Sequence, residues 1–259
     1  RSASRKARLT EAVATGPLGA LSHDELGVIV DGLADPLQPV VAVALSSTCL
    51  GLRTPLRPAL EVLKERHARV LALCRDFVTK GGVPLSVSEF SCTESVLAWP
   101  GTRPSAEHMA TLGMLLSTIG LPKLKFLYLG GSRFGNVGMR RLCEGLGEGM
   151  GDCTAPSLLG FALNSNNLWP TGAEALAATL RRVAMPQLHR LVLNRNPIGS
   201  QGLTALALPL RKLPALRKLG LDNCEIGDEG VASLVADLGK DNFKALEWLD
   251  LLNNRLTDA

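Results

Sequence analysis

Aromatic residues are scarce in this chain of 259 residues, at 4% of the total. Surfaces that bind single-stranded nucleic acid stack the bases on aromatic rings, so this composition argues against such a surface. The formal net charge is only +4, which is too small to favour binding to a phosphate backbone. We therefore expect no nucleic-acid partner.

Long apolar runs and paired cysteines are also missing. A membrane-spanning helix needs about 20 consecutive apolar residues, and the sequence has no such run. The six cysteines form no C-x-x-C pair, and no N-x-S/T sequon is present. Free thiols without glycosylation sites favour a reducing compartment, so we predict an intracellular, cytoplasmic protein. The basic first ten residues are interpreted as a disordered tail, with the remnant of an organelle transit peptide as the alternative.

Signatures of catalysis are absent as well. The four histidines (His23, His67, His108 and His189) are scattered and form neither H-E-x-x-H nor an i, i+4 pair, so we predict no metal site. The glycine-rich stretch 145–151 follows a predicted helix, whereas a phosphate-binding loop lies between a strand and a helix. No G-x-S-x-G and no Walker lysine occur. The sequence thus predicts a non-enzymatic protein with no cofactor.

A recurring leucine phrase is the main positive feature of the chain. It reads L-x-x-L-x-L-x-x-N-x-L, and its copies begin at Leu124, Leu158, Leu188, Leu216 and Leu246. The starts are separated by 34, 30, 28 and 30 residues. A nearly constant step of this size is typical of a solenoid, in which each unit buries its leucines against its neighbours.

Each copy predicts a short strand, a turn and a helix. Alternating leucines suit a strand with one buried face. The Asn that follows can bond backbone groups in the turn, and Cys224, which replaces it once, can do so in part through its thiol. Thr171, Ser200 and Asp228 are predicted to cap the helices that come next.

These residues resemble the leucine-rich repeat family in the long-helix form of ribonuclease inhibitor, over about residues 121–259. The resemblance implies an α/β solenoid, with a parallel sheet on its concave side and helices on its convex side. The chain begins at Arg1 rather than Met, and it ends where another helix phrase is expected. We therefore expect it to be part of a longer protein.

The predicted domain order is a basic tail (1–17), a helical domain (18–80) and the solenoid (81–259). Within the solenoid, residues 81–120 form an atypical first repeat, with a strand phrase at 85–92 and a helix at 105–119. Regular repeats then fill 121–259. In the helical domain, a helix over 55–76 is predicted to bury one apolar side, formed by Leu60, Leu63, Val70, Leu71 and Cys74.

The start of the helical domain is similar to an F-box. The similarity rests on the segment from Leu21 to Arg53, although Ser22 stands where that family usually has Pro and Leu52 where it has Trp. It implies a contact with the adaptor of a cullin-type ubiquitin ligase, made by Leu21, Leu26, Ile29 and Leu52. The alternative is a helical cap that closes the open core of the first repeat.

The residues between the strand leucines should point to the concave face. The candidate partner-binding residues there are Phe126, Tyr128, Arg190, Val192, Asn194, Lys218, Asp222, Trp248 and Asp250. Aromatic rings lie at both ends of this set and basic side chains between them, so the partner should present acidic groups. We predict a protein-interaction module or scaffold, with two alternatives: an F-box-type substrate receptor, or a structural subunit of a larger assembly.

Overall fold

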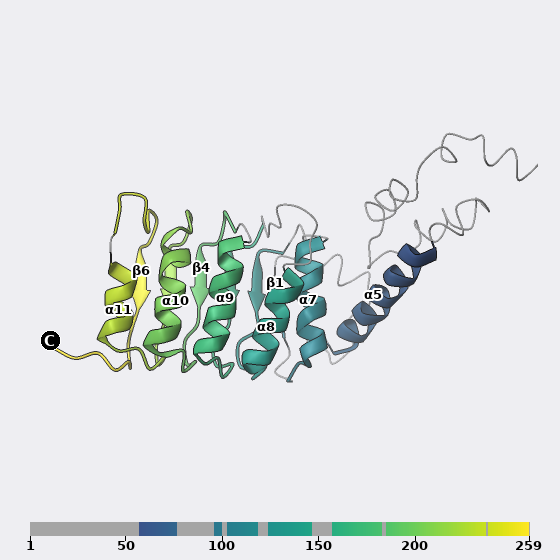
Figure 1. Ribbon diagram of the computed structural model, residues 1–259, viewed down its shortest axis with the longest axis horizontal. Helices are drawn as coiled ribbons and strands as arrows, with labels where there is room; N and C mark the ends of the chain where they lie inside the picture. Colours follow the sequence, from purple (N-terminus) through teal and green to yellow (C-terminus); the bar gives the residue numbers. More distant parts are fainter. Residues whose placement is uncertain are drawn as a thin grey trace, which may run out of the picture. The chain divides into compact units, whose positions relative to one another are not determined.

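The computed structural model describes residues 57–76, 96–99, 103–118, 124–146, 157–182, 185–236 and 238–258. The chain divides into two compact units, residues 1–72 and 73–259. The predicted tail (1–17), the F-box-like segment with Leu21, Leu26, Ile29 and Leu52, and the strand phrase at 85–92 lie outside the described residues. Helix and strand labels follow Figure 1.

Helix α5 (Arg57–Asp76) corresponds to the helix predicted over 55–76. Leu60, Leu63, Val70 and Cys74 are buried as predicted, but the prediction for Leu71 was wrong, because its side chain is 38% exposed. Leu73 is fully buried instead. Residues three apart share a helix face, so Leu73 continues the stripe that contains Val70, whereas Leu71 is turned away from it.

A six-stranded parallel sheet runs through the described part of residues 96–250 (Figure 1). Its strands are β1 (Val96–Ala98), β2 (Phe126–Tyr128), β3 (Gly160–Ala162), β4 (Arg190–Val192), β5 (Lys218–Gly220) and β6 (Trp248–Asp250). The strands pair in chain order, and each starts level with the next, as in Phe126 opposite Gly160. The predicted repeat strands β2 to β6 are therefore confirmed, and the described strand of the first repeat is Val96–Ala98.

Helices stack in a second row beside the sheet (Figure 1). They are α7 (Ala106–Thr118), α8 (Gly135–Leu146), α9 (Pro170–Arg182), α10 (Gly199–Arg211) and α11 (Asp228–Val235). The middle residues of β2 to β5 belong to the core of this unit and are at most 2% exposed; they are Leu127, Phe161, Leu191 and Leu219. The equivalent Leu249 is 37% exposed, because β6 has a neighbouring strand on one side only.

Helices α7 and α8 approach each other more closely than side chains would allow. A Cβ atom on Gly113 would lie 2.2 Å from the carbonyl oxygen of Leu142, and one on Gly145 would lie 2.3 Å from that of Ala110. Backbone therefore packs on backbone here, and glycine is required on both helices. The Ser117 hydroxyl donates a hydrogen bond to the Gly145 carbonyl across the same contact (3.0 Å).

Where a repeat has asparagine after its strand, at Asn166, Asn196 and Asn254, this residue links neighbouring repeats. Asn196 donates from Nδ2 to the carbonyl oxygens of Leu163 (2.9 Å) and Leu193 (2.7 Å). Its Oδ1 accepts hydrogen bonds from the backbone N–H groups of Asn166 (2.8 Å) and Leu168 (3.1 Å). The predicted turn role is confirmed. Asn196 also joins two repeats, because three of its four hydrogen-bond partners belong to the preceding repeat.

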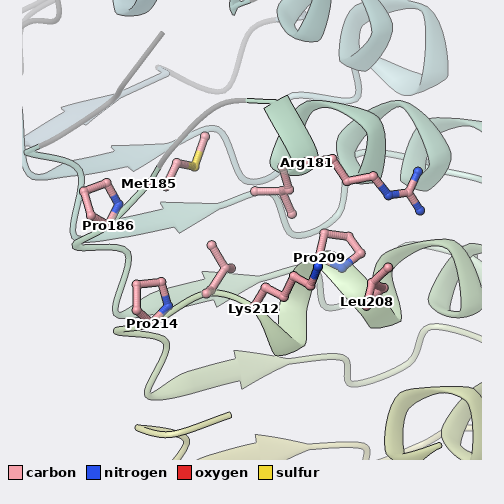
Figure 2. A pocket seen from close by; sticks show the side chains of 9 residues that line it. Arg181, Met185, Pro186, Leu208, Pro209, Lys212 and Pro214 are labelled. Atoms are coloured by element: carbon pink, nitrogen blue, oxygen red, sulfur yellow. The ribbon is translucent and has the colours of Figure 1, made fainter. Parts of the chain in front are cut away.

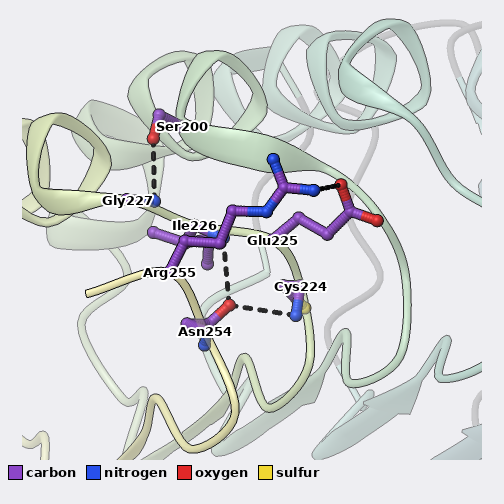
Figure 3. A network of polar contacts seen from close by, with 7 residues as sticks. All are labelled: Ser200, Cys224, Glu225, Ile226, Gly227, Asn254 and Arg255. Atoms are coloured by element: carbon purple, nitrogen blue, oxygen red, sulfur yellow. Dashed lines mark hydrogen bonds and ion pairs between the residues drawn. The ribbon is translucent and has the colours of Figure 1, made fainter. Parts of the chain in front are cut away.

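Asn254 repeats this arrangement, and Figure 3 shows it around Cys224. The Asn254 Oδ1 atom accepts hydrogen bonds from the backbone N–H groups of Cys224 and Ile226, each at 3.0 Å. Cys224 occupies the asparagine position of its own repeat, and its thiol contacts the carbonyl oxygen of Leu193 (3.3 Å). The thiol thus takes over part of the amide's role, as predicted.

The predicted helix caps were wrong. Helix α10 is preceded by Ile198 and helix α11 by Gly227, and neither helix has a side-chain cap. Thr171, Ser200 and Asp228 lie inside the first turn of their helices, because each helix begins one or more residues earlier than predicted.

Polar side chains near these helix starts bond the next repeat instead. The Ser200 hydroxyl accepts a hydrogen bond from the Gly227 N–H at 2.9 Å (Figure 3). Asn136 Oδ1 likewise accepts one from the Trp169 N–H at 2.8 Å. These contacts form a second set of links between repeats, so the stacking of repeats is fixed at both ends of the turn.

Candidate functional site

The candidate site is the face of the sheet that points away from the helices, called here the concave face. Strand residues alternate between the two faces, so the first and third residues of each strand point to it. From β2 to β6 the first residues are Phe126, Gly160, Arg190, Lys218 and Trp248. The third residues are Tyr128, Ala162, Val192, Gly220 and Asp250. The predicted strand residues therefore share one face.

An aromatic pair stands at the β2 side of this face. The rings of Phe126 and Tyr128 are parallel within 5°, with their centroids 6.2 Å apart. A Cβ atom on Gly160 would lie 2.5 Å from the Phe126 ring, so that ring extends over the neighbouring strand. Tyr128 remains 38% exposed. The ring of Tyr128 thus packs against that of Phe126 and leaves part of its surface open to solvent.

Among strands β2 to β6, β3 has the smallest pair of outward side chains. Its outward residues are Gly160 and Ala162, and both are buried. Neither carries a side chain longer than a methyl group, whereas Tyr128 stands on one side and Arg190 on the other. The ring of Phe126 lies over Gly160, so the small residues of β3 let the aromatic pair pack against this strand.

Two cations follow on adjacent strands. Arg190 and Lys218 are opposite one another in the β4–β5 register, and both are exposed. Adjacent strands lie about 4.8 Å apart, so the two positive charges are held near each other. Among the described residues, neither side chain has an ion-pair partner. Two neighbouring like charges without an internal counter-ion favour an external anion.

Trp248 ends the face on β6, with 46% of its surface exposed. Four strand spacings separate β2 from β6, so Trp248 and the aromatic pair are roughly 19 Å apart. Large aromatic residues are enriched among the residues that dominate protein interfaces. The face therefore has an aromatic anchor at each end and the two cations in between.

The polar residues predicted for this face are partly used by the fold itself. Asn194 Oδ1 accepts a hydrogen bond from the Asp222 N–H (3.2 Å), and Asp222 Oδ1 accepts one from Asn253 Nδ2 (2.8 Å). Asp250 Oδ1 accepts one from the Leu252 N–H (3.2 Å). These three side chains line the carboxyl ends of the strands, so the face is basic at one edge and acidic at the other. Asn253 was missed because it lies beyond the alternating strand positions.

The titratable groups give no sign of a reactive centre in the described part of the chain. Burial raises the pKa of the Cys143 and Cys224 thiols to about 11, so both stay protonated at neutral pH.

The described residues contain no group of three or more His, Cys, Asp or Glu residues that could hold a metal ion. The same residues contain no helix of sufficient length and apolarity to cross a membrane.

Comparison with known proteins agrees with this architecture. A family model described as a leucine-rich repeat matches residues 185–207 and 212–235. The matched repeats and the parallel sheet with its row of helices together show an α/β solenoid built from leucine-rich repeats. Repeats of this kind are modules for protein–protein interaction.

Three relatives extend the comparison. The chain is 30% identical to a Tonsoku-like protein of Bos taurus over 237 residues, which is 86% of this chain and 17% of that protein. It is 33% identical to the ribonuclease inhibitor of Sus scrofa over 52% of this chain and 28% of that protein. For the ribonuclease inhibitor of Mus musculus the identity is 32%, over 57% of this chain and 30% of that protein.

The chain thus spans less than a third of each of these relatives. The match to the Tonsoku-like protein covers more residues than the regular repeats contain, so it continues into the segment before residue 121. A solved structure of leiomodin-1 actin-binding site 2 is also similar, with 17% identity over 45% of this chain and 60% of that chain, and a TM-score of 0.35.

Proposed function

We propose that this chain is a non-enzymatic binding module that holds an acidic protein partner on its concave face. The observation that carries the proposal is the pair Arg190 and Lys218, exposed and without an internal counter-ion among the described residues. Exposed Tyr128 and Trp248 flank this pair. The similarity to ribonuclease inhibitors, proteins named for inhibiting another protein, supports a protein as the partner.

Recognition would follow from the arrangement of the face. A carboxylate of the partner would lie between Arg190 and Lys218, and apolar groups would pack on Tyr128 and Trp248. The hydrogen-bonded repeats hold the backbone of the strands in place before binding, so little backbone ordering entropy is lost on association. The acidic edge at Asp222 and Asp250 would repel a partner in the reverse orientation, which gives one preferred direction.

The experiment that tests this proposal uses a photo-reactive amino acid at Val192, on the concave face, and at Ala178, an exposed position on α9. A partner that binds the concave face should be captured from the first position and not from the second. Its affinity for the Tyr128→Ala/Trp248→Ala variant should fall at least tenfold, because interface aromatic residues carry a large share of the binding energy.

The fold should be unchanged in that variant, since both rings are exposed and neither is part of the core. Circular dichroism and the midpoint of thermal unfolding provide this control. A captured protein that binds the double variant with unchanged affinity would contradict the proposed surface. Capture from Ala178 alone would place the interaction on the helices instead.

A second candidate function rests on the F-box-like residues Leu21, Leu26, Ile29 and Leu52. We propose that in this case the F-box-like segment docks the adaptor of a cullin-type ubiquitin ligase, and the solenoid holds the target protein. Saturable binding of the intact chain to the purified adaptor, lost in Leu26→Asp and in Leu52→Asp, would support it. Absence of adaptor binding to the folded chain would reject this function and leave the role of a scaffold or of a permanent assembly subunit.

A further inference from the structure

A second surface, distinct from the concave face, lies where helices α9 and α10 end. Residues of the two helix ends and of the loops that lead into β4 and β5 enclose a pocket of about 440 Å³ (Figure 2). Leu180, Met185 and Leu213 form its buried floor, each at most 8% exposed. A volume of this size suits one or two side chains of a bound peptide.

Prolines make the walls of this pocket rigid. Pro186 and Pro214 hold the two loops, and Pro209 lies in the last turn of α10 (Figure 2). Proline has a fixed φ, so these walls lose little conformational freedom when a ligand binds. Leu208 stands beside them and is 45% exposed, which extends the apolar surface out to solvent.

Two cations stand at the rim of the pocket. Arg181 and Lys212 both line it and are both exposed, and none of the described lining residues is acidic. Figure 2 shows Arg181 reaching from α9 toward α10. The pocket therefore combines an apolar interior with an uncompensated positive rim.

Pro209 explains why Arg181 is fixed in this position. Proline lacks the N–H that would normally donate to the carbonyl four residues earlier, which is that of Ala205. The Arg181 Nη2 atom donates to this carbonyl instead, at 3.1 Å. One nitrogen of the guanidinium group is thus used to hold the side chain, and its other N–H donors are available to a ligand.

From these contacts we propose that the pocket is a docking site for a peptide segment of a protein partner, in which an aliphatic side chain is followed by an acidic one. The aliphatic side chain fills the space above Leu180 and Leu213. The carboxylate lies between Arg181 and Lys212, where charge complementarity is greatest. This site is separate from the concave face, so one partner could be held there while another occupies the sheet.

The test measures fluorescence anisotropy of a labelled peptide with three Leu-Asp pairs against the whole chain. Saturable binding is expected. Binding should be lost in a control peptide in which every Leu is replaced by Ser, and also in one in which every Asp is replaced by Asn. The Arg181→Gln/Lys212→Gln variant should weaken binding at least tenfold. Leu208→Asp should weaken it at least fivefold.

A matched control separates this site from general electrostatic attraction. Arg182→Gln/Lys240→Gln removes the same charge from exposed positions that do not line the pocket, and it should change affinity less than twofold. Pro209→Ala restores an N–H donor for the Ala205 carbonyl and so releases Arg181; it should weaken binding about threefold. If Arg181 and Lys212 only stabilised the helix ends, Arg181→Gln/Lys212→Gln would lower thermal stability and leave peptide affinity unchanged.

Three results would overturn the proposal. The first is a probe that shows no saturable binding. The second is binding that falls equally in the matched control, which would indicate non-specific attraction. The third is binding that is lost in Arg190→Gln/Lys218→Gln but retained in Arg181→Gln/Lys212→Gln, because the probe would then occupy the concave face.

Discussion

Single buried amides account for much of the order between repeats. Asn196 is fully buried and makes hydrogen bonds with backbone groups of two repeats. It follows Arg195, whose φ of 57° is in the left-handed region that few residues other than glycine and asparagine adopt easily. The chain accepts this local cost at Arg195, and the resulting turn directs the Asn196 amide into the core.

Replacing Asn196 by Ala should destabilise the fold by roughly 3 kcal/mol, because buried backbone donors and acceptors in two repeats lose their partner. Chemical denaturation with urea, followed by circular dichroism, measures this change. Gln187→Ala is the control: its side chain is exposed, and the expected change is within about 0.5 kcal/mol. Equal stability of Asn196→Ala and the parent chain would contradict the bridging role.

At the scale of elements, helices α7 and α8 pack so closely that each requires a glycine at the contact, Gly113 on α7 and Gly145 on α8. Gly113→Ala should cost at least about 2 kcal/mol, since the new methyl group would meet the Leu142 carbonyl and the helices must separate. Glu144→Ala, on the exposed side of α8, should change stability by less than about 0.5 kcal/mol. Thermal unfolding of the two variants distinguishes these outcomes, and a stabilised Gly113→Ala would refute the close packing.

The strands could be predicted from the sequence because the leucines alternate with a period of two and recur at a nearly constant step. The face to which Arg190 and Lys218 point follows from the same alternation. The role of Gly113 could not be predicted in this way, since it depends on the distance between two helices. The predicted helix starts were wrong because they too depend on contacts between repeats. Ser200 is a good cap by residue type, but its hydroxyl accepts a hydrogen bond from Gly227 of the next repeat.

The pocket between α9 and α10 was also beyond sequence reasoning. Its lining residues come from two helices and two loops, and they share no local pattern. Pro209 was the one available signal, because proline inside a helix leaves a carbonyl without its usual donor. That Arg181 of the preceding helix supplies the donor depends on how the two repeats stack.

At the scale of the whole molecule, the stacked repeats present charge of opposite sign at two edges of one sheet. The chain as a whole has a net charge of only +4, so the proposed preference for an acidic partner must come from where charges lie rather than from their sum. The concave face is positively charged at one edge, through Arg190 and Lys218. It is negatively charged at the opposite edge, through Asp222 and Asp250.

The most direct measurement is the affinity of the Arg190→Glu/Lys218→Glu variant for the partner captured at Val192, as a function of salt concentration. We expect at least a hundredfold loss of affinity at low salt, and this loss should become smaller as added salt screens the charges. Arg182→Glu/Lys240→Glu carries the same charge change away from the face and should bind like the parent chain. Unchanged affinity in Arg190→Glu/Lys218→Glu, with the fold intact, would contradict the claim that this face recognises an acidic partner.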